Sequence, residues 1–462
     1  MNSVLAPGHP LAVSVNARSQ QADSSDSPDS FDAERGPSRP WRADFRSVWA
    51  GETVSLIGSQ VFQLCLPLTA VLVLKASPGQ LGVLGALVYA PWLVLGLVAG
   101  WLVDRWQRRA VLIISDLGQS VAVGAIPILA VLGRLSFGWL LGLAGLAGVF
   151  RVFFTVAYRS YLPQIVPSAH LAMANSRLTA SESVAEIGGP GLGGVLALIV
   201  GAPFALAADS VSYLFSAAGF ARVRRREVPA APADGSALSH IAEGFRFSFG
   251  NAYLRAFVGE AASYNLFWQM AQTVLALFAV TQMGMSAGML GVTLAIGAVG
   301  ALAGSAVTVP AAHRLGLNRT LIGSAVIGDL APLALPAAQR GMWAVPLFAA
   351  AFLVQGFGIT ACNVHVMTVR QTLTPPHLLG RANAAYMFVA QGVKPVGALL
   401  GGWLGTLAGP RTALAVAALG LLSTSLFLVF SPLRRIKDLD DITAPPLRRW
   451  SSGGDSRRIS GR

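Results

Sequence analysis

The sequence GWLVDRWQRRAVL occupies residues 100–112 and decides the fold, because it puts dense charge between two long apolar runs. These runs cover about 81–103 and 110–132, and each is long enough to cross a bilayer, which needs about 20 residues. Charge at such density is excluded from hydrocarbon. Residues 104–109 are therefore expected to form a tight turn at a membrane surface, and their arginines place this turn on the cytoplasmic side.

The composition of the chain indicates an integral membrane protein. Of its 462 residues, 54% are hydrophobic and 12% are charged, with a mean hydropathy of +0.59. An ordinary globular domain carries about 25% charged residues, so a soluble enzyme is excluded. Twelve apolar runs predict an all-α integral membrane fold with twelve transmembrane helices. The runs lie at about 48–74, 80–103, 110–132, 136–158, 171–200, 204–222, 253–282, 287–310, 319–338, 342–369, 383–408 and 411–432.

The distribution of positive charge identifies the cytoplasmic side. The net charge is +13, and all but six of the 34 Lys and Arg residues fall in one alternating set of loops, helix ends and tails. The exceptions are Lys75, Arg134, Arg340 and Arg411 in the opposite loops, and Arg151 and Lys394 within spans. This asymmetry places both termini in the cytoplasm. A nucleic-acid partner is not expected, because it would need a folded basic face with base-reading or stacking residues.

Polar segments divide the chain into two halves. Residues 1–40 are rich in Ser, Asp, Pro and Gly, which is typical of a disordered tail. The longest loop carries three arginines at 224–226, followed by Pro, Ala, Gly and Ser, as in a flexible linker. The predicted organisation is a disordered cytoplasmic tail (1–45), an N-terminal six-helix bundle (46–222), a cytoplasmic linker (223–251), a C-terminal six-helix bundle (252–432) and a cytoplasmic tail (433–462).

The two halves resemble each other in sequence. A shift of 208 residues lays Ala-Asn at 174–175 on Ala-Asn at 382–383, and Gly-Gly at 193–194 on Gly-Gly at 401–402. The matched pieces hold the same topological place, near spans 5 and 11. This pattern predicts a parallel pseudo-repeat about an axis along the membrane normal.

Cofactor and metal chemistry is not expected. Cys65 and Cys362 each lie alone in an apolar run, so we expect neither a disulfide nor a metal site. The sequence carries no Walker-type phosphate loop, so ATP is not expected to drive the protein directly.

The charged loop resembles a family signature. Read as Gly-x-Leu-x-Asp-Arg-x-x-Arg-Arg between spans 2 and 3, it is similar to the signature loop of the major facilitator superfamily, although Gln107 stands where the family usually has glycine. The resemblance implies that Asp104 meets the N-terminus of span 11 when the cytoplasmic side is shut, where a carboxylate is stabilised by about 0.3–1 kcal/mol. The alternative is that the loop only fixes topology. The gating candidates are Gly100, Asp104, Arg105, Arg108 and Arg109.

Span 5 contains the sequence GGPGLGG at residues 188–194. Its glycines formally match a dinucleotide-binding pattern, but no strand precedes them, so this interpretation is discarded. Read as Gly-Pro-x-x-Gly-Gly, the residues Gly189, Pro190, Gly193 and Gly194 resemble the motif of the antiporter branch of the superfamily. The functional interpretation is a bend and a tight seal between the halves that limits proton leak, and the alternative is plain helix packing. The expected partner is span 8, with Gly291, Gly297, Gly300 and Gly304.

Ionisable residues within spans are costly, which makes them functional candidates. They are Glu52, Asp116, Arg151, Glu182, Glu186, Asp209, Glu260, Asp329, His365 and Lys394. The family fold places spans 1, 4, 7 and 10 around a central cavity and spans 3, 6, 9 and 12 outside, so the three aspartates are expected to be structural. Glu186, Glu52 and Glu260 are the candidates for proton coupling, and Glu186 coincides with Lys394 under the 208-residue shift. The alternative for each is a hydrogen bond between helices.

A cavity for a large apolar ligand is expected between the halves. The candidate lining residues are Arg151, Trp268, Gln269, Asn363, His365 and Lys394, together with aromatic and flexible neighbours such as Tyr264, Phe267, Met270, Phe357 and Met367. Mostly apolar walls with few polar groups suit drug-like molecules. The alternative for the aromatic residues is contact with lipid or with other helices.

More narrowly, the chain resembles the efflux branch that includes macrolide and siderophore (enterobactin-type) exporters. The supporting residues lie at 55–59, 161–167 and 174–175 and in the glycine-proline motif. The resemblance implies a transporter, and not an enzyme, that exports a small and largely hydrophobic molecule by alternating access with proton antiport. We expect a monomer in the inner membrane of a bacterium, with lipid, substrate and protons as partners. The alternatives are a proton-independent facilitator or importer of a small metabolite, and a membrane sensor that does not transport.

Overall fold

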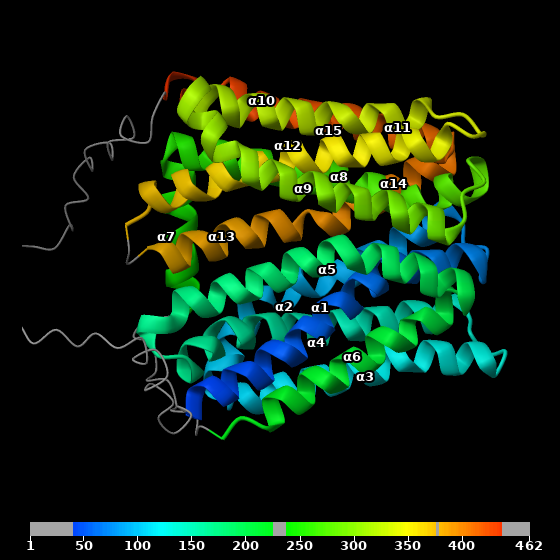
Figure 1. Cartoon of the computed structure of the whole chain (residues 1–462), viewed down its shortest axis with the longest axis horizontal. Coiled ribbons are helices and arrows are strands. Elements are labelled where there is room, and N and C mark those ends of the chain that lie inside the picture. The colour runs from blue at the N-terminus through cyan, green and yellow to red at the C-terminus, as the bar shows by residue number, and fades with distance from the viewer. Residues whose placement is uncertain (1–39, 225–236, 376–377, 437–462) are drawn as a thin grey trace, which may run out of the picture. The chain divides into compact units, whose positions relative to one another are not determined.

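The computed structural model describes residues 40–224, 237–375 and 378–436, and the regular elements of these residues are helices (Figure 1). The first half consists of α1 (Pro40–Leu72), α2 (Pro78–Arg105), α3 (Arg108–Val131), α4 (Phe137–Ile165), a short turn η2 (Ser168–His170), α5 (Leu171–Ile199) and α6 (Ala202–Ala221). The second half consists of α8 (Ala252–Leu277), η3 (Phe278–Gln282), α9 (Ala287–Leu315), α10 (Leu317–Leu330), η4 (Ala331–Leu333), α11 (Ala334–Ala337), α12 (Ala344–Leu373), α13 (Leu379–Gly392), α14 (Lys394–Ala408), α15 (Pro410–Val429) and η5 (Pro432–Arg435). The predicted tails cover 1–45 and 433–462, but residues 40–45 already belong to α1 and residues 433–435 to η5. Residues 1–39 and 437–462 of these tails lie outside the described residues.

The helices confirm the predicted fold class. Among the described residues, nine helical segments are long and apolar enough to cross a membrane, and the remaining spans are α5, α8 and the pair α13 and α14. The eleventh span is in two pieces because Pro395 lies at the start of α14 and has no N–H to donate back to α13. The ninth span is likewise interrupted at η4, which contains Pro332.

The predicted linker contains a helix that the flexible composition did not suggest. Residues 237–250 form α7 (Ala237–Gly250), which packs against α13. The ring of Phe245 lies edgewise to that of Phe388, with centroids 6.0 Å apart, and Arg381 of α13 forms an ion pair with Glu243. An apolar face on α7 therefore has a partner in the second half, which explains why this part of the linker is ordered as a helix.

Two close helix pairs join the halves, α5 with α9 and α2 with α14. In the first pair, a Cβ added at Gly194 would lie 2.8 Å from the carbonyl oxygen of Ala287 and 3.0 Å from Cα of Gly291. In the second pair, a Cβ at Gly402 would lie 2.6 Å from Cα of Gly82. Gly194 and Gly402 are 208 residues apart, as the pseudo-repeat predicts. Glycine at both contacts lets the backbones approach more closely than any side chain allows.

The buried apolar residues show at which end the halves meet. One large cluster includes residues of both halves, from Val61 and Leu68 of α1 to Val274 of α8 and Leu290 of α9. Two smaller clusters each belong to one half, with Phe220 in the first and Phe257 in the second. The first also contains Trp41, at the start of the described residues, and the second contains Ile436, at their end. The halves are therefore packed together at the end that carries the α1–α2 and α8–α9 loops.

Candidate functional site

A central cavity of about 430 Å³ lies between the two halves. The first half contributes Gln60, Gln63, Tyr89, Glu186 and Pro190 to its wall, and the second half contributes Trp268, Gln269, Gln272, Leu294 and Lys394, among others. Five of the residues singled out from the sequence thus line one cavity, namely Glu186, Pro190, Trp268, Gln269 and Lys394. Its volume falls in the range of small-molecule sites, about 300–1,000 Å³.

Charged groups enter the central cavity from both halves. Glu186 lies on α5, one turn before Pro190, and Lys394 begins α14. The ammonium nitrogen of Lys394 lies 5.0 Å from the ring centroid of Tyr89 on α2, so a cation–π contact crosses between the halves. The side chain of Trp268 lies nearly parallel to that of Tyr264, with centroids 6.2 Å apart. The cavity therefore combines one carboxylate, one ammonium group and aromatic surface.

A second group of charged residues lies inside the first half, away from the central cavity. The Arg151 guanidinium donates to Oγ of Ser59 at 3.4 Å, and Glu52 is buried at 7% exposure. Neither residue lines the central cavity, although the sequence suggested Arg151 as a lining residue and Glu52 as a proton carrier. Asp116 and Asp209 are fully buried on α3 and α6, and Asp209 accepts a hydrogen bond from Ser212 at 3.4 Å.

The other candidates of the second half lie away from the central cavity. Glu260 and Asn363 line a smaller cavity of about 250 Å³ between α8, α12 and α13. His365 is buried, and its Nε2 is 2.7 Å from Oγ1 of Thr308 on α9. This contact joins α9 to α12, so His365 does not reach the central cavity, where the sequence had placed it. Asp329 accepts a hydrogen bond from Thr424 at 2.9 Å, between α10 and α15.

The glycine-proline motif contacts two helices. A Cβ at Gly193 would lie 3.2 Å from Cα of Val61, so that this side of α5 packs on α1, while Gly194 packs on α9. The prediction that span 8 is the partner is met at Gly291. It is wrong for Gly297, Gly300 and Gly304, which face Phe352, Leu353 and Phe357 of α12. Because α9 presents glycines on two sides, a list of glycines in one span did not reveal which neighbour each of them contacts.

The charged loop joins α2 to α3. Arg109 donates from Nε to the carbonyl of Phe220 at 3.0 Å and from an Nη to the carbonyl of Ala221 at 2.5 Å, at the C-terminus of α6. A guanidinium at this position stabilises the negative end of the helix dipole. Arg108 is buried and Arg105 is exposed. The surroundings of Gly100 and the side chain of Asp104 lie outside the described part of the chain, so the aspartate gate stays a prediction.

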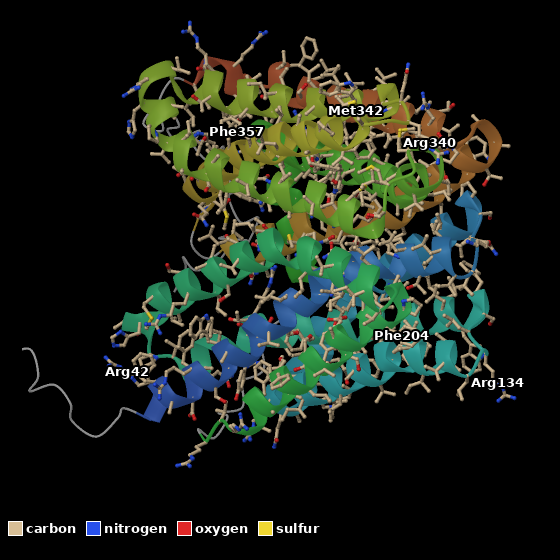
Figure 2. The ribbon with its side chains drawn as sticks, turned by 45° about the vertical axis from the view of Figure 1, so that its right-hand side comes forward. Arg42, Arg134, Phe204, Arg340, Met342 and Phe357 are labelled. Atoms are coloured by element: carbon tan, nitrogen blue, oxygen red, sulfur yellow. The ribbon has the colours of Figure 1, made fainter. Side chains whose placement is uncertain are left out.

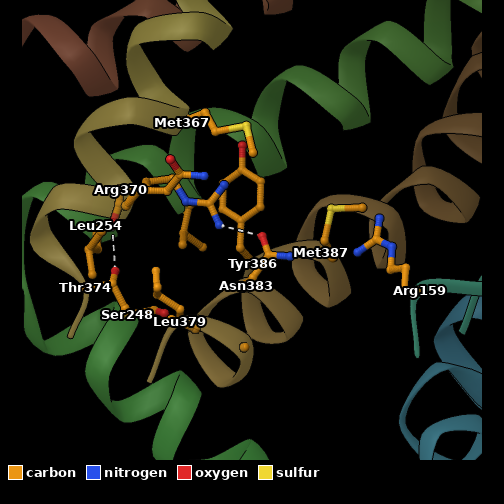
Figure 3. A pocket seen from close by; sticks show the side chains of 14 residues that line it. Arg159, Ser248, Leu254, Met367, Arg370, Thr374, Leu379, Asn383, Tyr386 and Met387 are labelled. Carbon is orange, nitrogen blue, oxygen red and sulfur yellow. Dashed lines mark hydrogen bonds between the residues drawn. The ribbon is translucent and has the colours of Figure 1, made fainter. Parts of the chain in front are cut away.

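A second ligand-sized cavity was not predicted from the sequence. This arginine cavity has a volume of about 670 Å³, and its wall includes Arg159 of α4, Arg370 of α12, and Asn383, Tyr386 and Met387 of α13 (Figure 3). The tenth apolar run predicts a span that ends near residue 369, which places Arg370 at its cytoplasmic end. The helix α12 continues to Leu373 and turns Arg370 into the cavity.

Two pseudo-symmetric six-helix halves around a shared, ligand-sized cavity define a multi-pass membrane transporter. A family model described as Major Facilitator Superfamily matches residues 48–394 and 264–452. The chain belongs to this superfamily, and it is not an enzyme.

Curated relatives and solved structures agree with this assignment. The chain is 28% identical over 372 residues to the multidrug efflux pump Tap of Mycolicibacterium fortuitum, covering 77% of this chain and 87% of that protein. It is 24% identical over 411 residues to the enterobactin exporter EntS of Salmonella typhi, covering 86% of this chain and 95% of EntS. The fold is similar to the crystal structure of a mutant of the nucleoside transporter NupG, with a TM-score of 0.70 and 10% identity. The match covers 84% of this chain and 99% of NupG. All three proteins are transporters by name, and Tap and EntS are exporters.

Proposed function

We propose that this protein exports a small, largely hydrophobic molecule by alternating access and that inward movement of protons drives the export. The relatives named above include a multidrug efflux pump and an enterobactin exporter, which supports export over uptake. We further propose that it works as a monomer in the inner membrane of a bacterium. The positive-inside distribution of Lys and Arg supports a cytoplasmic location for both termini.

The observation that carries the proposal is that Glu186 and Lys394 line the wall of one cavity. They occupy equivalent positions of the two halves, and each is attached to a helix that packs on the opposite half, α5 on α9 and α14 on α2. A relative movement of the halves therefore changes the distance between the carboxylate and the ammonium group. The protonation of Glu186 and the arrangement of the halves become linked, which is what coupled transport requires.

The same cavity suits an apolar cargo. Much of its wall is aliphatic or aromatic, with Leu84, Val88 and Trp268 among the lining residues. Its polar groups include the amides of Gln60, Gln63, Gln269 and Gln272, the hydroxyls of Tyr89 and Thr273, and the charged groups of Glu186 and Lys394. Such a wall binds the apolar part of a cargo by contact and uses the polar groups for orientation.

The test uses purified protein in liposomes with an imposed proton gradient and a panel of hydrophobic antibiotics and siderophores. We expect substrate-stimulated proton movement, recorded as lumenal pH, that Glu186→Gln abolishes. Glu182→Gln is the matched control, because Glu182 lies one turn earlier on α5 and does not line the central cavity. Glu52→Gln and Glu260→Gln test the two rival carriers.

The outcomes separate the alternatives. Movement of substrate that ignores the proton gradient would favour a facilitator. Binding without movement would favour a membrane sensor. If Glu186→Gln, Glu52→Gln and Glu260→Gln all keep coupled export, the carboxylate mechanism is wrong even though the transporter assignment stands.

A further inference from the structure

The arginine cavity lies outside the central cavity and has its own chemistry. Of the described residues in its wall, two are arginines and none is Asp or Glu. The remaining wall is of two kinds. Leu254, Val258 and Met387 are apolar, while Ser248 and Gln371 are neutral and polar. A cavity with this composition favours a molecule that carries both an apolar body and a negative charge.

Arg370 is held in a fixed position by its neighbours. Its guanidinium carbon lies 3.4 Å from the ring centroid of Tyr386, and one Nη donates to Oδ1 of Asn383 at 3.2 Å (Figure 3). The stack and the hydrogen bond restrict the side chain, so little conformational entropy remains to be lost when an anion binds. The hydrogen bond to Asn383 engages one of the five N–H donors of a guanidinium.

The second arginine comes from the other half of the molecule. Arg159 is exposed near the end of α4 and is labelled at the opposite edge of the cavity from Arg370 (Figure 3). A bound anion would thus be shared between the halves. Glu182 of α5 is the carboxylate whose charge acts on Arg159, and it does not line the cavity. The cavity wall itself remains cationic.

The first turn of α13 adds to this field. Leu379, Gly380 and Ala382 line the cavity, and the side chain of the N-cap residue Leu378 makes no capping hydrogen bond. The positive end of the helix dipole therefore lies at the wall of the same cavity as the two guanidinium groups. The cavity is at the end of the molecule where each half has its own apolar cluster, away from the glycine contacts.

From this arrangement we propose that the arginine cavity binds an anionic amphipathic molecule, such as an aromatic carboxylate, sulfonate or phosphate, before that molecule reaches the central cavity. The apolar wall takes the ring system, and Arg159 and Arg370 take the acidic group. This inference rests on the proposed export function, because it assigns a chemical class to the exported substrate. The central cavity then receives the molecule with Lys394 as its only cationic lining residue among the described ones.

The experiment compares two probes that share one ring system, of which one is an anion and the other is neutral. Naphthalene-2-sulfonate and naphthalene-2-sulfonamide are titrated calorimetrically into the full-length protein in phosphatidylcholine nanodiscs, with empty nanodiscs as the blank. We expect the sulfonate to bind at least tenfold more tightly, which corresponds to about 1.4 kcal/mol. Arg370→Gln and Arg159→Gln are each expected to reduce that preference about tenfold, while Arg370→Lys retains part of it.

Arg255→Gln is the matched control. Arg255 is an exposed arginine of α8 that donates to the carbonyl of Phe249 and does not line the cavity. Arg159 is exposed as well, so its variant tests the site even if Arg370→Gln fails to fold. Equal affinity of the two probes for the unmodified protein would overturn the proposal. The proposal would also be overturned if Arg255→Gln reduced the preference for the sulfonate as much as the two cavity variants do.

A further arm separates a soluble ligand from a lipid headgroup. If phosphatidylglycerol in the nanodiscs abolishes sulfonate binding, the site belongs to lipid and the substrate assignment is overturned. Binding and transport fail independently. Sulfonate binding that depends on both arginines, without proton-coupled export in liposomes, would keep the anion site and remove the proposed function. Coupled export, together with sulfonate binding that does not depend on the arginines, would keep the proposed function and remove the anion site.

Discussion

The contact at Gly194 gives the sharpest test of how the halves are held together. A Cβ at this position would lie 2.8 Å from the carbonyl oxygen of Ala287, about 0.6 Å short of the 3.4 Å at which ordinary contact begins. The obstacle is backbone, so a side chain cannot turn aside to make room. Gly194→Ala therefore has to push α5 away from α9 or leave the two helices strained.

The magnitude follows from the size of the overlap. Adding a methyl group to a well-packed contact costs about 1–3 kcal/mol. Since this contact closes one end of the molecule, the cost falls on the present arrangement and not on one in which that end is open. The ratio of open to closed forms should rise by about 5- to 150-fold. Gly402→Ala meets Cα of Gly82 at 2.6 Å and should act in the same direction.

The assay is a spin–spin distance measurement across this end. Arg134 and Arg340 are exposed, come from different halves, and are labelled at the end of the molecule opposite Arg42 (Figure 2). Spin labels on cysteines at these two positions should show a longer distance in a larger fraction of Gly194→Ala molecules. Cys65 and Cys362 are buried, so they compete little for the label.

The control variant is Gly188→Ala on the same helix. A Cβ at Gly188 meets nothing within 4 Å, so this variant gains the helix propensity of alanine without the overlap. A distance distribution unchanged in Gly194→Ala, or changed equally in Gly188→Ala, would refute the reasoning.

Three further predictions concern stability. Thr308→Val leaves the buried His365 without its partner and should lower stability by about 1–3 kcal/mol, seen as a lower Tm, with proton-coupled transport retained; loss of transport at unchanged Tm would contradict this. Arg109→Gln removes two hydrogen bonds to the end of α6 and should lower stability by a similar free energy, seen as a lower Tm. An unchanged Tm would argue against the cap. Arg381→Ala breaks the exposed ion pair with Glu243 and should cost under about 1 kcal/mol, less at high salt; a larger loss would show that α7 depends on it.

The sequence alone predicted the fold class, and of the six residues expected to line the central cavity, Trp268, Gln269 and Lys394 do so. Hydrophobic runs of span length predict a twelve-helix fold, because hydrocarbon admits neither unpaired backbone nor dense charge. The 208-residue repeat aligns Glu186 with Lys394 in the sequence, and both line one cavity in the fold. Equivalent helices of a repeat lie at equivalent depth, so a sequence shift carries three-dimensional information.

Only the tertiary structure decided which neighbours each residue meets. His365 and Arg151 are ionisable residues in spans, as Glu186 is, yet they contact Thr308 and Ser59 and not the central cavity. The rotation of a helix about its axis is set by packing against several others at once, and a hydropathy pattern that is apolar on all sides does not encode it. For the same reason the glycines of α9 divide between α5 and α12, and Arg370 joins Arg159 across the two halves.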